Sequence, residues 1–237
     1  MGEGRTLLLT RPRAQSEAFA ALVAERLPGR FRAVIAPLIE VRALPGVPDL
    51  AGVGGLAFTS ANGVEQFAAR SDDRSFTAWC VGEMTAAAAC AAGFEARSAE
   101  GDVAALAALI AAEWRPGAGE ILHLRGRFAA GDLVAALAAA GVPGRAAEIY
   151  DQRPVAVSGE AAALLAAGGV EVASFFSPRT ALLFVGEAAQ RRWNLSRTVA
   201  VSLSEAADAA LAALAFGERR VAAHPGREGM LAALAAV

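Results

Sequence analysis

The strongest constraint on this 237-residue chain is an internal repeat of about half its length. Three segments of the first half have counterparts in the second half, in the same order and at nearly constant spacing. These pairs are LLLTRP with ILHLRG, placing Arg11 over Arg125 at a spacing of 114; FTSANG with FFSPRT, placing Ser60 over Ser177 at 117; and WCVGEMTA with VAVSLSEA, placing Val81 over Val201 at 120. Short loops would absorb the drift, so the sequence predicts one unit folded twice.

Each unit is predicted to follow the order β-α-β-β-α-β-α. TLLLTRP, Thr6–Pro12, is a pattern typical of a buried strand that ends at Pro12, and residues 15–27 follow with helical apolar spacing. Strands that alternate with helices favour a parallel sheet covered by helices on both faces. Prolines mark two extended segments at equivalent places in the repeat, 37–48 and 148–155. The predicted fold is therefore α/β, with two similar lobes joined by a two-stranded extended connector that forms a hinge.

The charged residues exclude several functional classes. A formal net charge of −2 argues against a nucleic-acid binder, which normally carries a basic face. All 22 basic residues are arginine, so the chain has no lysine for a Schiff base, for pyridoxal phosphate or for a Walker-type phosphate site. Its two histidines, His123 and His224, have no metal-ligand spacing around them. We therefore expect no metal site, and we expect His123 to be a core residue inside a strand.

Other patterns point to a soluble cytoplasmic protein. No apolar run reaches the roughly 18 to 20 residues of a membrane span, because the longest one stops at Glu113. The first twelve residues hold too short an apolar stretch for a signal peptide. Cys80 and Cys90 form no CxxC motif and are expected to stay reduced and partly buried. The glycine clusters 52–55 and 117–119 precede predicted strands, where a dinucleotide fingerprint would follow one.

Six motifs in order, spread over essentially the whole chain, resemble the uroporphyrinogen-III synthase family. They are LLLTRP, FTSANGV, VGEMTA, LRG, EIYDQRP and FFSPRTALLF. The resemblance implies two α/β lobes, in which residues 1–38 pair with 155–237 and residues 39–150 form the other lobe. It also implies a lyase of tetrapyrrole (haem) biosynthesis that needs no cofactor. Such an enzyme closes the linear tetrapyrrole hydroxymethylbilane, with loss of water and inversion of the last pyrrole ring.

A substrate with many carboxylates fits the predicted helix starts. Helix N-termini present unpaired N–H groups and the positive end of the helix dipole, so they bind anions without lysine. Four predicted helices begin where parallel strands end, and their substrate-binding candidates are Ser60, Asn62 and Gly63; Thr85, next to Met84; Ser177 and Arg179; and Ser204. The serines and the threonine could equally be ordinary N-caps, worth about 1 kcal/mol each. Arg11 and Arg125 are expected to pair with carboxylates because guanidinium is a bidentate donor.

The resemblance assigns a catalytic role to Tyr150, the only tyrosine of the chain. Its hydroxyl could hydrogen-bond the departing water, although a phenol with a pKa near 10 is a weak acid at neutral pH. A packing role in the connector is the alternative. One departure concerns the second unit, where VSLSEA stands in place of the glycine and threonine that the family shows. Aligned this way, Ser202 replaces the glycine, and the loop before Ser204 should approach a ligand less closely.

Two other functions are compatible with parts of this pattern. A non-catalytic two-lobe protein could close on a small anion, although proteins of that kind are usually exported. A pair of signalling domains would need clustered acidic residues after the first strand, where TLLLTRP has arginine. Alanine-rich helices offer little apolar surface for a large subunit interface, so we expect a monomer whose only partner is the small-molecule tetrapyrrole.

Overall fold

The computed structural model describes residues 4–128 and 131–237. The chain forms two compact units. The first contains the described residues up to Glu40 together with Arg153–Val237, and the second is Val41–Gln152. The chain passes between the units twice, within strands β3 (Ile39–Ala43) and β8 (Gly144–Pro154), which are neighbours in one sheet. The expected lobe boundaries lie within a few residues of this division, and the assignment of these units as the two functional lobes remains a prediction.

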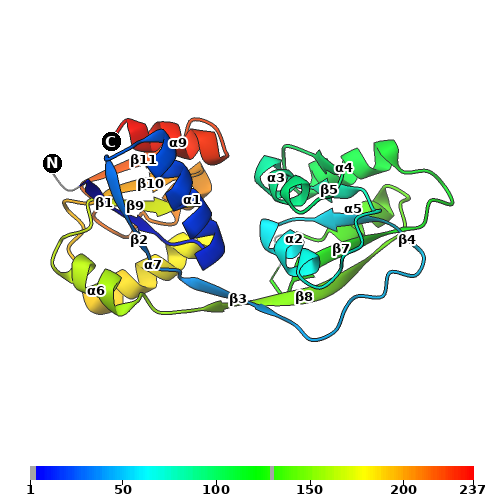
Figure 1. Cartoon of the computed structure of the whole chain (residues 1–237), viewed down its shortest axis with the longest axis horizontal. Coiled ribbons are helices and arrows are strands. Elements are labelled where there is room, and N and C mark those ends of the chain that lie inside the picture. The colour runs from blue at the N-terminus through cyan, green and yellow to red at the C-terminus, as the bar shows by residue number, and fades with distance from the viewer. Residues whose placement is uncertain (1–3, 129–130) are drawn as a thin grey trace. The chain divides into compact units, whose positions relative to one another are not determined.

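The first unit is a five-stranded parallel sheet with the order β11-β10-β9-β1-β2. Its strands are β1 (Arg5–Leu9), β2 (Phe31–Ile35), β9 (Val172–Phe175), β10 (Val199–Ser202) and β11 (Glu218–Val221), and its helices are α1 (Arg13–Arg26), α6 (Gly159–Ala166), α7 (Pro178–Arg191), α8 (Glu205–Ala209) and α9 (Arg227–Ala235). Figure 1 shows helices packed against this sheet, at the blue and red ends of the colour scale.

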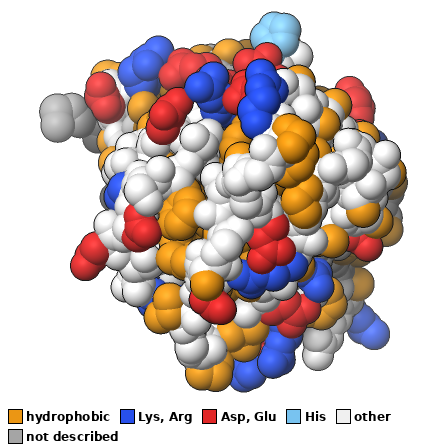
Figure 2. All heavy atoms as spheres, turned by 90° about the vertical axis from the view of Figure 1, so that its right-hand side faces the viewer, with side chains coloured by type: hydrophobic (Ala, Val, Ile, Leu, Met, Phe, Trp, Pro, Cys, Tyr) orange, Lys and Arg blue, Asp and Glu red, His pale blue; other side chains and the backbone are white. Residues whose placement is uncertain are grey.

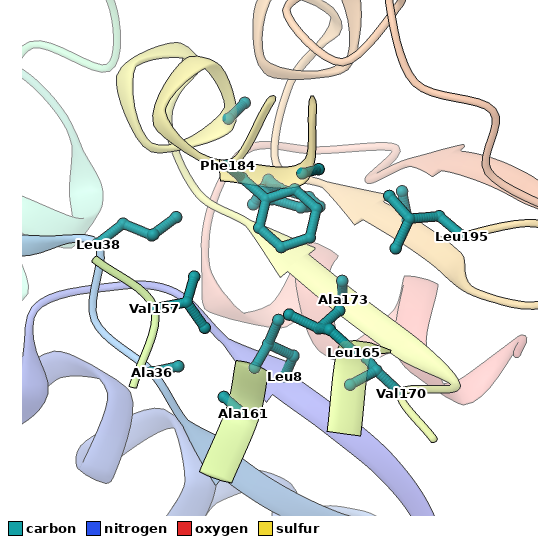
Figure 3. Packing of buried hydrophobic residues seen from close by; sticks show 14 of the residues in the cluster. Leu8, Ala36, Leu38, Val157, Ala161, Leu165, Val170, Ala173, Phe184 and Leu195 are labelled. Carbon is teal, nitrogen blue, oxygen red and sulfur yellow. The ribbon is translucent and has the colours of Figure 1, made fainter. Parts of the chain in front are cut away.

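Both faces of this sheet are buried. On one face Leu8 packs with Ala161 and Leu165 of α6 and with Phe184 of α7, as Figure 3 shows. Leu7 and Leu9 point to the opposite face because side chains alternate along a strand, and they too are fully buried. That face is covered by α1 and α9, which contact one another. The predicted parallel sheet with helices on both faces is thereby confirmed for this unit.

The second unit repeats this architecture in a six-stranded sheet with the order β3-β8-β7-β4-β5-β6. Its further elements are β4 (Val53–Phe58), β5 (Ala78–Cys80), β6 (Ala96–Ser98) and β7 (Glu120–Gly126), with helices α2 (Ala61–Ala68), α3 (Glu83–Ala91), α4 (Val103–Glu113) and α5 (Leu133–Ala139). The helices α2 and α3 pack on one face over Phe58 and Leu124. The helices α4 and α5 pack on the other face over Trp79 and Ile121.

The strand registers test the sequence repeat. Leu9 pairs with Ser174 in the first sheet, and His123 pairs with Ala57 in the second. Ser60 and Ser177 cap the helices that follow β4 and β9, which fixes that spacing at 117, and the two pairs then make His123 the counterpart of Leu9 at a spacing of 114. The first two predicted spacings are thereby confirmed. In this correspondence β7, β8, β4, β5 and β6 match β1, β2, β9, β10 and β11, so the two units share one strand order.

The third predicted pairing, Val81 over Val201, is wrong by two residues. The Val81 N–H donates to the Phe58 carbonyl at 3.0 Å, and the equivalent bond in the first unit runs from Leu203 to Phe175 at 2.9 Å. Val81 therefore corresponds to Leu203, at a spacing of 122. The helix-capping Gly82 is then matched by Ser204, which also caps a helix, and not by the buried Ser202. Because the segments that follow both strands are rich in alanine, the sequence did not distinguish this pairing from one shifted by two residues.

Three other sequence predictions need correction. The predicted order β-α-β-β-α-β-α omits the helix α6 between β8 and β9, and it omits the edge strands β6 and β11 and the helix after each of them. Those strands are only three and four residues long and are partly exposed, so they lack the continuous apolar run that marks a buried strand. Gly54 and Gly55 lie inside β4 and not before it. Cys90 is exposed, while Cys80 is buried, and both are free thiols.

No helix among the described residues is long and apolar enough to cross a membrane.

Candidate functional site

The strand order defines one place in each sheet where a ligand is expected. From β1 the chain continues to β2 on one side, and from β9 it continues to β10 on the other side. Ligands of open α/β sheets bind at such a reversal, outside the carboxyl ends of the two strands. The equivalent reversal of the second sheet lies between β7 and β4. Arg11 and Ser177 follow the strands at the first reversal, and Arg125 and Ser60 lie at the second.

At the first reversal Arg11 is held in place by its neighbours. Its guanidinium carbon lies 4.3 Å from the centre of the Phe176 ring, within the range of a cation–π interaction. Its Nη2 donates to Oε1 of Gln15 at 3.0 Å, and the Ser16 hydroxyl donates to the Arg11 carbonyl at 2.9 Å. The half-buried Arg11 side chain is therefore positioned by the strand end and by the first turn of α1.

The two predicted serines of the first unit are helix caps. The Ser177 Oγ accepts from the Thr180 N–H at 3.2 Å and lies 2.9 Å from the Thr180 hydroxyl, at the start of α7. Arg179 is half-buried in the same first turn. The Ser204 Oγ accepts from the Ala207 N–H at 3.3 Å, at the start of α8. Each hydroxyl oxygen already has a backbone donor, so both serines have the capping role that was one of the two expected alternatives.

At the second reversal the helix start is tightly packed. Ser60 caps α2 and accepts from the Asn62 N–H at 3.3 Å. Asn62 and Gly63 are both buried. A Cβ at Gly63 would lie 2.8 Å from the Leu124 carbonyl oxygen, so glycine is needed there for α2 to approach β7 closely. This packing accounts for Gly63 without a ligand, and its predicted substrate contact stays a prediction.

The start of α3 differs from the other three helix starts that the sequence predicts to bind substrate, those of α2, α7 and α8, which are capped by serine side chains. Its cap is Gly82, which has no side chain to satisfy the first N–H groups, so these depend on the backbone alone. Thr85, the predicted substrate contact, lies in the first turn and is buried. Of these four predicted starts, the N-terminus of α3 is therefore the one at which no side-chain cap competes with an anion for the backbone N–H groups.

Charged residues surround Tyr150 at the place where the end of β7 pairs with β8. The Nη2 of Arg125 donates to Oε1 of Glu148 at 2.9 Å, so this predicted carboxylate-binding arginine already has an internal carboxylate. Tyr150 is 3% exposed, and its ring packs on Gly126, where a Cβ would lie 2.6 Å from the ring. Because so little of the ring is exposed, a catalytic role for Tyr150 requires its hydroxyl to be the part that reaches substrate.

His123 lies beneath this edge and carries no charge at neutral pH. The ring is 2% exposed, and its Nε2 lies 3.1 Å from the Thr59 hydroxyl oxygen. Burial, and secondly the positive charge of Arg125, lower the pKa of His123 to about 4. His123 is therefore a hydrogen-bonded core residue, as expected. Together with Arg125 and the start of α5 it lines a hollow of about 460 Å³ in the second unit.

The sequence interpretation missed two charged residues at this edge, Arg127 and Asp151. Both form ion pairs beside Tyr150, with Arg127 Nη1 3.7 Å from Asp151 Oδ2. The available signal was the repeated Arg-x-Arg, RPR at 11–13 and RGR at 125–127. Figure 2 shows basic and acidic side chains close together on the face it presents, with no continuous basic patch. Within residues 4–128 and 131–237 no group of three or more potential ligands could hold a metal ion.

Comparison with known proteins agrees over most of the chain. A family model described as uroporphyrinogen-III synthase HemD matches residues 19–232. The crystal structure of the uroporphyrinogen-III synthetase of Helicobacter pylori superposes with a TM-score of 0.66 at 15% identity, covering 98% of this chain and 99% of that one. A mutant uroporphyrinogen III synthase of the extremely thermophilic bacterium Thermus thermophilus superposes with a TM-score of 0.57 at 19% identity, covering 98% and 96%. At these identities the two structures show a shared fold. No curated protein sequence matches the chain.

Proposed function

Because the chain belongs to the uroporphyrinogen-III synthase family, we propose that it closes hydroxymethylbilane at the carboxyl-terminal edges of its two sheets. The family match over residues 19–232 is the observation that carries this function. The family acts on a small-molecule tetrapyrrole in haem biosynthesis, as a cyclising lyase. The proposal adds which residues of this chain hold the substrate and which assist the chemistry.

Substrate binding is assigned to residues at the two strand-order reversals and at the neighbouring helix starts. The proposed contacts are Arg11, Ser177, Arg179 and Ser204 in the first unit, and Ser60, Asn62, Gly63, Thr85 and Arg125 in the second. Two observations support this assignment. These residues follow or end parallel strands, where open α/β sheets bind ligands. The α3 start, capped by Gly82, leaves backbone N–H groups to bind a carboxylate.

The chemistry requires positioning and charge stabilisation more than acid–base groups. A hydroxyl must leave, the cationic azafulvene that results must be stabilised, and the chain must be folded so that attack falls on the substituted carbon of the last ring. Holding the reacting ends together supplies much of the rate, because it converts an encounter into an intramolecular step. Fixed dipoles and charged groups supply electrostatic stabilisation. We assign to the Tyr150 hydroxyl the hydrogen bond to the departing water.

We also propose that the enzyme works as a monomer in the cytoplasm. The two free thiols, Cys80 and Cys90, are typical of a reducing compartment. Among the described residues the exposed large apolar side chains are Val47, Phe128 and Leu182, which are few for a large subunit interface.

One assay tests the function. The purified protein is supplied with freshly generated hydroxymethylbilane, and the porphyrinogen isomers are separated after oxidation. Formation of uroporphyrinogen III is the expected result. Formation of isomer I alone, the product of unaided ring closure, would reject the proposal and favour a non-catalytic protein that binds a small anion.

A further inference from the structure

Each unit has an Arg-x-Arg sequence at the same place in the fold, after β1 in the first unit and at the end of β7 in the second. Arg11 and Arg125 are repeat counterparts, and so are Arg13 and Arg127, at the same spacing of 114. We call Arg11 and Arg125 the inner arginines and Arg13 and Arg127 the outer arginines. We propose that the outer arginines bind carboxylates of the tetrapyrrole substrate. This inference rests on the proposed function and extends it to residues that nothing above assigns to the substrate.

The inner arginines already donate to groups of the protein. Arg11 donates from Nη2 to Gln15 and stacks on Phe176, while Arg125 donates from Nη2 to Glu148 at 2.9 Å. The Arg125 side chain is only 28% exposed. For either residue to bind a substrate carboxylate in the bidentate manner, an existing hydrogen bond would have to be exchanged or supplemented, which lowers the net gain in binding.

The outer arginines have the opposite character. The Arg127 side chain is 54% exposed, and its two carboxylate neighbours lie 4.0 Å away, at Glu148, and 3.7 Å away, at Asp151. The Arg13 side chain is 66% exposed and lies 3.6 Å from Glu17. All three separations exceed hydrogen-bonding distance, so within the described residues neither guanidinium donates a hydrogen bond. Each guanidinium can therefore donate hydrogen bonds to an incoming carboxylate without first losing a hydrogen bond inside the protein.

Their place in the fold matches the place where a ligand is expected. Arg127 is the first residue after β7. Its backbone N–H donates to the Tyr150 carbonyl at 3.1 Å, so Arg127 lies next to the proposed catalytic residue. Arg13 is the first residue of α1, four residues after the end of β1. The strands β1 and β7 each border the strand-order reversal of their sheet. A guanidinium on each is well suited to a substrate that carries several acetate and propionate groups.

The test compares two variants with two matched controls. Arg127→Gln is paired with Arg97→Gln, because the Arg97 side chain is 47% exposed and also has two carboxylate neighbours, Glu95 and Glu113. Arg13→Gln is paired with Arg26→Gln, which lies at the other end of α1 with a 52% exposed side chain and one carboxylate neighbour. For each variant kcat and KM for hydroxymethylbilane are measured together with the ratio of isomer III to isomer I.

We expect each outer-arginine variant to lose about ten-fold or more in kcat/KM, the size of one charge-assisted hydrogen bond, mainly through a higher KM. The controls should stay within about two-fold of the parent, as surface ion pairs contribute little. Arg127→Lys should recover part of the loss because it keeps the charge without the bidentate geometry.

Folding is controlled separately, because removing Arg127 takes a counter-ion from the largely buried Asp151. Thermal unfolding is measured for every variant, and Arg127→Lys keeps a counter-ion at that position. If Arg13→Gln and Arg127→Gln both turn over substrate like their controls while the parent makes isomer III, the inference is wrong and the proposed function stands. If the parent itself makes only isomer I, the proposed function is rejected, and the inference that rests on it is rejected as well.

Discussion

Replacing His123 with glutamine should make the second unit less sensitive to acid. In the folded chain burial lowers the pKa of this ring from its ordinary value of 6.5 to about 4. The unfolded chain therefore takes up a proton below about pH 6.5, and the folded chain takes it up only below about pH 4. Between these values the unfolded state binds more protons, so stability falls as the pH falls. Below about pH 4 the loss is complete.

The size of the effect follows from the two pKa values. The full difference corresponds to about 3 kcal/mol, and about 2 kcal/mol of it should be lost between pH 7 and pH 5. Glutamine has no proton to gain and can still hydrogen-bond the Thr59 hydroxyl. The variant should therefore lose about 2 kcal/mol less than the parent over this interval, whatever its absolute stability at pH 7.

Urea unfolding at pH 7 and pH 5 measures this difference. Trp79 and Trp114 lie in the second unit, and Trp193 lies in the first. A Trp193→Phe background therefore makes tryptophan fluorescence report on the second unit alone. His224→Gln is the matched control, because His224 is exposed and is the only other histidine. Equal pH dependence in the His123→Gln variant and the parent would refute the argument, as would an NMR titration that places the His123 pKa near 6.5.

Four further substitutions test other parts of the structure. Gly126→Ala places a Cβ 2.6 Å from the Tyr150 ring, and should cost about 1–3 kcal/mol in urea unfolding; a neutral result would show that the ring can move freely. Tyr150→Phe should lower kcat with an unchanged melting temperature, and unchanged kcat would remove the hydroxyl from the reaction. Ser60→Ala should cost about 1 kcal/mol as a lost cap, with any larger fall in kcat/KM reporting substrate contact. Arg70→Met removes donors to the carbonyls of Leu44, Gly46 and Ile149 and should cost about 3 kcal/mol in unfolding, whereas a cost below about 1 kcal/mol would mean that water replaces them.

The sequence was sufficient for the parts of the fold that local patterns determine. The apolar runs of β1 and β7 are fully buried strands, and Ser60 and Ser177 cap helices at repeat-equivalent positions because their hydroxyls satisfy N–H groups a few residues away. The edge strand β11 could not be found in the same way. Its four residues are partly exposed and owe their extended form to pairing with β10, which is a contact between distant parts of the chain.

The candidate site was predictable in position and not in detail. Strand ends and the repeat located Arg11 and Arg125, but only the side-chain contacts reveal that Arg125 is already hydrogen-bonded to Glu148, 23 residues away. Gly63 shows a similar limit. Its place at a helix start made it a substrate-binding candidate, and the structure shows a separate need for glycine there, the close approach of α2 to the Leu124 carbonyl. Both roles require a small residue, and sequence alone does not distinguish them.

A duplicated fold raises the question of how two similar edges could serve a reaction that inverts only one ring of its substrate. The repeat-equivalent positions after β4 and β9 differ in chemistry. In the first unit this position is Phe176, whose ring lies under the Arg11 guanidinium. In the second unit it is Thr59, whose hydroxyl is hydrogen-bonded to the neutral His123. Under the proposed function, the aromatic surface beside an arginine in one unit and the polar hydroxyl in the other would give parts of a linear tetrapyrrole different contacts, even though the backbones of the two units repeat.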